Sequence, residues 1–173
     1  MQKTIALVVA YEGFQEKEYH ETRRVLEAAD FKVTTVSDAS GFATDHTGLV
    51  VPVDVTLDKF QPALCDGFFV IGGPGALEHL DNSVTYRILN EMYALQKPYG
   101  AICIAPRILA KAEVLRHKKA TCWDADNGTA DLFEQHAVTF TKKPVVTDGC
   151  VVTADGPQAA TEFGKAIIDC MRS

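Results

Sequence analysis

A single cysteine lies where the sequence changes from a strand pattern to a helix pattern. The stretch PYGAICIAPRILAKAEVL covers residues 98–115, and Cys103 directly follows the apolar run 99–102. Pro106 suits the first position of a helix, because the N–H that it lacks has no helical partner there. The chain must therefore reverse its direction across residues 103–105, as in a nucleophile elbow that lifts a reactive side chain above a sheet.

The start of a helix beside Cys103 would lower the pKa of its thiol. The alternative is an inert cysteine buried in the core.

Glu18 is the second residue that could carry chemistry. It lies in the segment EGFQEKEYHETRRVLEAAD, which is acidic near its start. Helical spacing places one stripe through Glu18, Thr22, Val25 and Ala29. The stripe is expected to face the interior, whereas Glu16 points away from it. Burial raises the pKa of a carboxyl group, so we expect Glu18 to be protonated and to donate a hydrogen bond to an anion such as a thiolate.

A glycine loop follows one of the apolar runs. The stretch VIGGPGAL covers residues 70–77, but Glu78 stands where a dinucleotide fingerprint would need its third glycine. Gly72 and Gly73 instead allow backbone N–H groups to approach a bound oxyanion closely. A plain tight turn is the alternative.

The elements that must position these residues alternate along the chain. Continuous apolar runs at 4–10, 67–73 and 99–105 are typical of parallel strands buried on both faces, and 31–37 is a further strand. Helical patterns cover residues 16–29, 81–96 and 106–113. Asp148-Gly149 between two β-branched runs predicts a hairpin, and an amphipathic helix follows it. This alternation predicts one α/β domain over residues 1–173, with a parallel sheet covered by helices.

Composition excludes several classes of protein. The net charge of −6 argues against a nucleic-acid surface, which would need a basic stripe, and no apolar run approaches the roughly 20 residues of a membrane helix. Five cysteines without a CxxC pair form neither a disulfide framework nor a zinc site. We therefore expect no metal, no nucleic-acid or membrane partner, and a reducing cytoplasmic location.

Four motifs in order resemble the DJ-1/PfpI superfamily, also called ThiJ/PfpI, over essentially the whole chain. The elbow AICIAP at residues 101–106 is similar to the family's A-I-C-x-G-P, with Ala105 in place of the usual glycine. Glu18 in FQEKEYHET matches the family's glutamate early in the first helix. Gly72-Gly73 matches its glycine loop, and DGCVVTADGPQAATEFGKAII resembles its closing hairpin and helix.

The resemblance implies a fold and a set of site residues. The fold would be a class I glutamine amidotransferase-like, flavodoxin-like three-layer sandwich: a mostly parallel sheet with helices on both faces and a C-terminal β-hairpin plus helix, usually dimeric. Cys103 would be the reactive thiol beside protonated Glu18, and the N–H groups of Gly73 and Ile104 would form the oxyanion site. Trp123 and Asp124, in the loop ATCWDADNGT, are candidates for the pocket wall. The alternative for Trp123 is packing against the core or a dimer partner.

Three functions follow from the resemblance. The first is a Cys-dependent, cofactor-free enzyme acting on small reactive carbonyls, as glyoxalase III-like or deglycase-like members do. The second is a redox-sensing or chaperone-like stress protein that uses oxidation of Cys103. The third is a small-molecule binding domain with an incidental thiol. The peptidase or amidase branch is disfavoured, because Ile104 replaces the histidine that follows the cysteine there.

Overall fold

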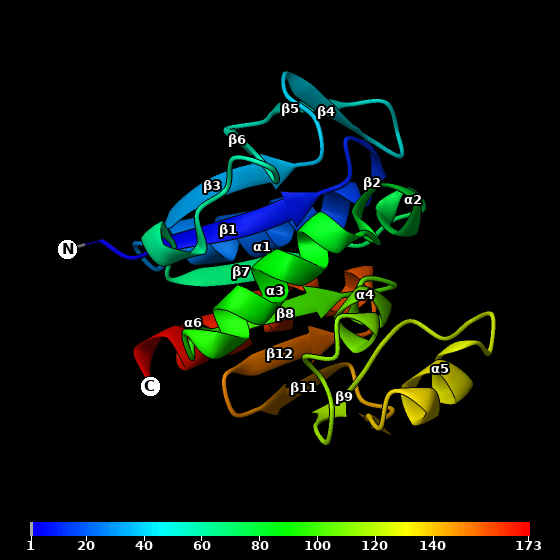
Figure 1. Cartoon of the computed structure of the whole chain (residues 1–173). Helices are drawn as coiled ribbons and strands as arrows, with labels where there is room; N and C mark the ends of the chain where they lie inside the picture. Colours follow the sequence, from blue (N-terminus) through cyan, green and yellow to red (C-terminus); the bar gives the residue numbers. More distant parts are fainter. Residues whose placement is uncertain (1) are drawn as a thin grey trace.

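A seven-stranded sheet forms the centre of the computed structural model, which describes residues 2–173 (Figure 1). Its strand order is β11-β12-β8-β7-β1-β3-β6. Within the described residues all neighbours pair in parallel except β11, which runs antiparallel to β12 at one edge. In chain order the strands are β1 (Thr4–Val9), β3 (Lys32–Ser37), β6 (Val55–Thr56), β7 (Gly67–Val70), β8 (Tyr99–Ile102), β11 (Val145–Asp148) and β12 (Val151–Ala154).

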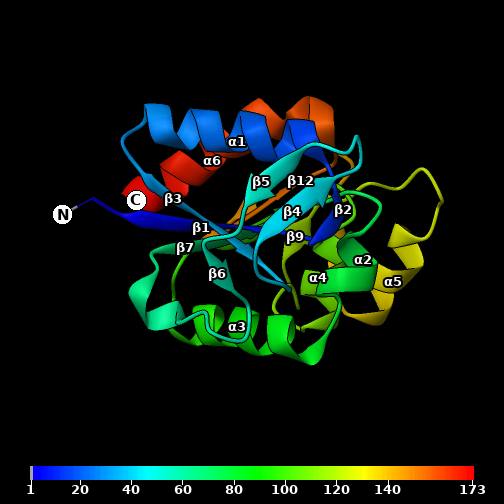
Figure 2. The same cartoon turned by 90° about the horizontal axis from the view of Figure 1, so that it is seen from above.

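Helices cover both faces of this sheet and make a three-layer α/β sandwich. Figure 2 shows α1 (Glu16–Ala28) side by side with α6 (Ala160–Arg172) on one face, and α3 (Ser83–Ala94) on the other. On the side of α3 lie the shorter helices α2 (Ala76–Leu80), α4 (Pro106–Lys111) and α5 (Thr129–Gln135). The parallel sheet covered by helices, which the alternating pattern predicted, is confirmed, and so is the flavodoxin-like sandwich that the resemblance implied.

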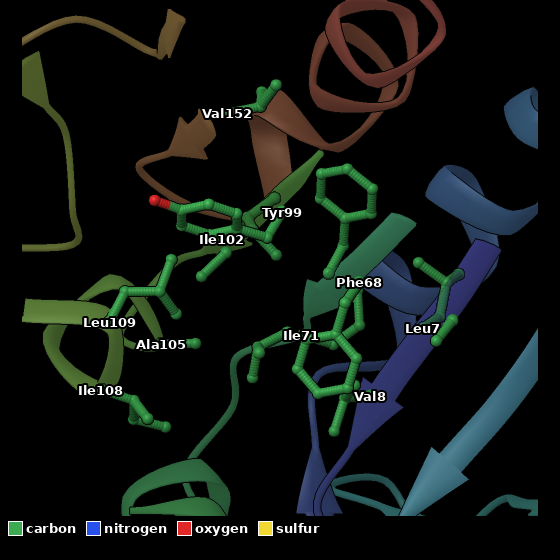
Figure 3. Packing of buried hydrophobic residues seen from close by; sticks show 14 of the residues in the cluster. Leu7, Val8, Phe68, Ile71, Tyr99, Ile102, Ala105, Ile108, Leu109 and Val152 are labelled. Atoms are coloured by element: carbon green, nitrogen blue, oxygen red, sulfur yellow. The ribbon is translucent and has the colours of Figure 1, made fainter. Parts of the chain in front are cut away.

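The core explains why the central strands are apolar throughout. Strand β1 is buried from Ile5 onward, and every residue of β7 and β8 is buried, because helices pack on both of their faces. Figure 3 shows Phe68 and Ile71 between Leu7 and helix α4, in which Ile108 and Leu109 are fully buried. The residues just after β8 are thus held between a rigid sheet and a packed helix.

The observed elements agree closely with the predicted ones, with two differences. The apolar runs 67–73 and 99–105 are longer than their strands, which end at Val70 and Ile102. The hairpin is confirmed, but Asp148 pairs with Val151, so the two turn residues are Gly149 and Cys150. Gly149 adopts a φ of 61°, the left-handed conformation that glycine accepts at little cost.

A second, three-stranded sheet extends beyond the predicted elements. It contains β2 (Glu12–Phe14), β4 (Phe42–Asp45) and β5 (Val50–Pro52) in the order β2-β4-β5. A small pair of β9 (Lys119–Ala120) and β10 (Thr139–Phe140) lies near α5. No helix within residues 2–173 has both the length and the apolar character needed to cross a membrane.

The parallel topology brings distant segments to one edge of the sheet. The carboxyl ends of β7, β8 and β12 lead directly into the glycine loop at 72–73, into Cys103 and into residues 155–157. Open α/β sheets bind their ligands at this edge.

Candidate active site

Cys103 occupies a strained turn between β8 and α4. Its φ is 63°, a left-handed conformation that is uncommon for a residue with a Cβ. Its backbone N–H donates to the carbonyl of Ala154 on β12 (N···O 2.9 Å), and its own carbonyl accepts from the N–H of Trp123 (2.8 Å). These bonds hold the turn from both sides. The geometry is that of the predicted nucleophile elbow.

Glu18 reaches the elbow from the first turn of α1. The Gln15 side chain caps this helix, since its Oε1 accepts from the N–H groups of Lys17 (2.7 Å) and Glu18 (3.4 Å). The carboxyl of Glu18 is fully buried; Oε2 accepts from the N–H of Gly72 (2.9 Å), while Oε1 has no hydrogen-bond partner among the described residues. Burial raises the pKa of Glu18 to about 7, although the Gly72 N–H and the Cys103 thiol both oppose this rise.

The glycine loop lets these two side chains meet. A Cβ on Gly72 would lie 2.6 Å from the Cβ of Cys103 and 2.9 Å from Oε2 of Glu18. Gly73 has a φ of 116°, and a Cβ there would lie 2.5 Å from the backbone nitrogen of Gln15. Both positions therefore exclude any larger residue, one by close approach and the other also by backbone conformation.

A pocket of about 400 Å³ opens above the thiol. Its walls are mainly apolar, and it is lined by Gln15, Gly73, Pro74, Leu77, Cys103, Ile104, Trp123 and Pro157. Within the described chain, neither the N–H of Gly73 nor that of Ile104 donates to a backbone carbonyl. Both residues line the pocket together with Cys103.

The prediction that the helix start lowers the pKa of Cys103 is not confirmed. Burial raises this pKa, the charge of the Glu18 carboxylate raises it further, and the Ile104 N–H offsets only a part. Helix α4 spans only Pro106–Lys111, which limits the dipole that can favour a thiolate. The thiol and the carboxyl therefore do not both ionise near neutral pH, and above the pKa of Glu18 the pair still shares one proton.

The chain is similar to known proteins over nearly its whole length. The model of the DJ-1/PfpI family matches residues 3–170. The chain belongs to the DJ-1/PfpI family. An uncharacterized protein of Methanocaldococcus jannaschii is 31% identical over 95% of this chain and 80% of its own length. A deglycase of Pyrococcus horikoshii is 32% identical over 73% of this chain and 74% of its own. The crystal structure of a ThiJ/PfpI domain protein from Brachyspira murdochii has a TM-score of 0.93 at 24% identity, covering 99% and 98% of the two chains.

Within this DJ-1/PfpI fold, two of the predicted site residues have other contacts. Asp124 lies outside the Cys103 pocket: its Oδ1 accepts from the N–H of Thr129 (2.9 Å) at the start of α5, and it lines a neighbouring pocket. Gly72 donates its N–H to Glu18, so that group is not available to a substrate oxygen. Gly73, Ile104 and Trp123 do line the pocket with Cys103, as expected.

Several pocket residues of this DJ-1/PfpI family member were not predicted. Pro74 and Leu77 follow the glycine loop, Pro157 follows β12, and Gln15 precedes α1. Only the capping position of Gln15 could have been inferred, because the N-terminus of a helix needs a side-chain acceptor. The others have no chemical signature of their own, and only the folded chain brings them to the thiol.

Two histidines of this member of the family pair with carboxylates: His79 with Asp38 (Nδ1···Oδ2 2.7 Å) and His136 with Glu113 (2.7 Å). No histidine is among the described residues that line the Cys103 pocket. Among the described residues no cluster of three His, Cys, Asp or Glu side chains has the arrangement of a metal site. Glu18 is thus the titratable group that the structure places beside the thiol.

Proposed function

We propose that this protein is a cofactor-free enzyme that uses Cys103 and Glu18 to convert small reactive carbonyl compounds, in the manner of a glyoxalase III or a deglycase. The observation that carries the proposal is the thiol of Cys103, which lies on a left-handed turn and lines the pocket beside the fully buried carboxyl of Glu18. Burial raises the pKa of this carboxyl to about 7. A group that titrates near neutral pH can both accept and return a proton during turnover. The deglycase-named relative at 32% identity supports the same class of substrate.

The chemistry balances without an outside oxidant or reductant. With the proton on Glu18, the Cys103 thiolate attacks the aldehyde carbon of a 2-oxoaldehyde and forms a carbon–sulfur bond. The carbonyl electrons move to oxygen, which takes the proton of Glu18 and receives hydrogen bonds from the N–H groups of Gly73 and Ile104. Glu18, now a carboxylate, removes the proton from this carbon, and the electrons pass to the adjacent carbonyl oxygen, which takes up the hydroxyl proton. Glu18 then returns its proton to the adjacent carbon, leaving a 2-hydroxy thioester. Water hydrolyses the thioester to a 2-hydroxy acid and regenerates the thiol.

The decisive experiment compares Glu18→Gln with Glu16→Gln. Both residues lie in the first turn of α1, but only Glu18 is buried against the thiol. We expect Glu18→Gln to abolish the conversion of methylglyoxal to lactate, by at least a factor of about 100, while the circular dichroism spectrum stays unchanged. Glu16→Gln should retain the wild-type rate. Wild-type turnover in Glu18→Gln would eliminate the mechanism.

A redox-sensing role is the second candidate, and one observation favours it. Cys103, Cys150 and Cys170 are partly exposed, but of these three Cys103 is the one beside the buried carboxyl of Glu18. The unpartnered Oε1 of Glu18 could donate a hydrogen bond to a sulfinate formed on Cys103. Two equivalents of peroxide should then add two oxygens to Cys103 before the other four thiols. Uniform oxidation of all five would exclude this role.

We also propose a homodimer in a reducing cytoplasm. Three large apolar side chains of the β4–β5 hairpin are exposed, namely Phe42 (61%), Leu49 (65%) and Val50 (58%). An apolar surface of this kind is suited to a protein partner. The cytoplasmic location is supported by the five free cysteines. Size-exclusion chromatography with light scattering tests the dimer directly.

A further inference from the structure

Arg107 is the one arginine of the chain with almost no exposure among the described residues. It follows Pro106 at the start of α4, and only 8% of its surface is accessible. A buried guanidinium must find partners for its N–H groups, because an unpaired buried charge is strongly unfavourable. Its side chain donates hydrogen bonds to residues 123–129, which we call the Trp123 loop, and it also interacts with the Cys122 thiol directly before this loop.

The guanidinium holds this loop at three points. Two of its N–H groups bind the carboxylate of Asp126 in a fork, with Nη1···Oδ2 at 2.9 Å and Nη2···Oδ1 at 2.5 Å. Nη2 and Nε donate to Oγ1 of Thr129 (2.9 and 3.2 Å), and Nη2 also reaches the carbonyl of Trp123 (3.4 Å). Oγ1 of Thr129 in turn donates to that same carbonyl (2.8 Å). The loop therefore folds around the guanidinium.

The Trp123 side chain is held in the same arrangement. The guanidinium carbon of Arg107 lies 5.8 Å from the centroid of the Trp123 ring, within the range of a cation–π contact. The backbone N–H of Trp123 donates to the carbonyl of Cys103 at the elbow (2.8 Å). The backbone of Trp123 is thus bonded to Cys103, and its ring contacts Arg107. Trp123 also forms one wall of the Cys103 pocket.

We propose that Arg107 is a positioning residue that holds Trp123 as a fixed wall of the Cys103 pocket, and that it thereby sets the affinity for carbonyl compounds with an aromatic or other large apolar substituent. The substrate part rests on the proposed function; the positioning of Trp123 does not. A side chain that is already ordered before binding loses little entropy on contact with the ligand, so the ligand binds more tightly.

Lysine cannot replace arginine in this role. The contacts use a planar fork and at least three nitrogen donors, whereas an ammonium group is a point charge without this geometry. The loop is also packed against the fork, since a Cβ on Gly128 would lie 3.3 Å from Nη1 of Arg107. The substitution Arg107→Lys keeps the positive charge but loses the fork, so it distinguishes the effect of the charge from that of the hydrogen-bond geometry.

The first test uses fluorescence, because Trp123 is the only tryptophan of the chain. In Arg107→Met and Arg107→Lys we expect stronger quenching by acrylamide and a shifted emission maximum, while urea unfolding stays cooperative. Arg116→Met is the matched control, since Arg116 is exposed and pairs only with Glu113 on the surface. Quenching unchanged from the wild type in both Arg107 variants would overturn the proposal.

The second test measures the pocket without any turnover. Phenacyl bromide alkylates a thiol and brings a benzoyl group into the pocket, whereas iodoacetamide is too small to need the Trp123 wall. We expect Arg107→Met to weaken saturable binding of phenacyl bromide before alkylation of Cys103 by roughly tenfold, with the limiting alkylation rate unchanged. The iodoacetamide rate at Cys103 should stay within about twofold of the wild type.

The outcomes separate this proposal from the proposed function. A parallel loss of both alkylation reactions would mean that Arg107 merely supports the elbow, and would overturn the positioning role. Full recovery of phenacyl bromide binding in Arg107→Lys would show that charge suffices, and would refute the role of the fork. A wild-type protein that does not convert methylglyoxal would remove the enzyme hypothesis, yet both tests on Arg107 would still decide its role.

Discussion

Replacing Glu18 by glutamine should change how the stability of the protein depends on pH. The pKa of this carboxyl is 4.5 in the unfolded chain, and burial raises it to about 7 in the folded one. Between pH 4.5 and about 7 the folded protein binds more protons than the unfolded chain does. The stabilising contribution of the neutral carboxyl is therefore complete below pH 4.5 and is lost as the pH rises through 7. The rise in pKa corresponds to about 3 kcal/mol. Glutamine does not titrate and escapes this loss.

The assay is urea unfolding of wild type and Glu18→Gln at several pH values from 4.5 to 8. The free energy of unfolding of the variant minus that of the wild type should rise by about 3 kcal/mol across this range. The contributions of the other titratable groups to the free energy of unfolding cancel in this difference. Glu16→Gln, in the same helical turn, should show a difference that is constant within about 0.5 kcal/mol. A flat difference for Glu18→Gln would show that its carboxyl is already ionised at pH 5, and the shared-proton argument would fail.

Four further outcomes are expected. Alkylation of Cys103 by iodoacetamide should rise up to about pH 7 and then level off, because the charge of ionised Glu18 opposes formation of the thiolate, and this plateau should disappear in Glu18→Gln; peptide mass mapping reports it. Cys103→Ser should lower lactate formation from methylglyoxal to background, with cooperative unfolding retained. Gly73→Ala should destabilise the fold by at least about 2 kcal/mol in urea unfolding, because its Cβ would collide with Gln15, whereas Gly48→Ala, with open space around it, should cost about 1 kcal/mol. Leu49→Lys should convert a dimer to a monomer in light scattering, and an unchanged mass would place the dimer surface elsewhere.

The elements around the elbow were predictable because local patterns agree with the tertiary structure there. The apolar runs are continuous where strands are covered on both faces, and Pro106 begins α4 as its position suggested. The burial of Glu18 also followed from helical spacing alone. The small sheet of β2, β4 and β5 was not predicted, because its strands are three or four residues long and too short for a clear alternation.

The roles of Asp124 and Gly72 could not be predicted from neighbouring residues. A short acidic residue before a helix can face a pocket or cap the helix, and only the folded loop shows Asp124 bonded to the N–H of Thr129. A glycine N–H beside an elbow can serve a ligand or a carboxylate, and the position of α1 assigns that of Gly72 to Glu18.

The sequence by itself determined the fold, the thiol on the turn and the carboxyl on the buried helical face, because each depends on residue type and on spacing within one element. The tertiary structure decided how protons are distributed between them. A helix start favours a thiolate, but burial of Cys103 and the charge of Glu18 outweigh it, and burial depends on which segments pack together. The packing of Arg107 against Trp123 was decided at the same level, since these residues belong to two separate segments and meet only in the folded chain.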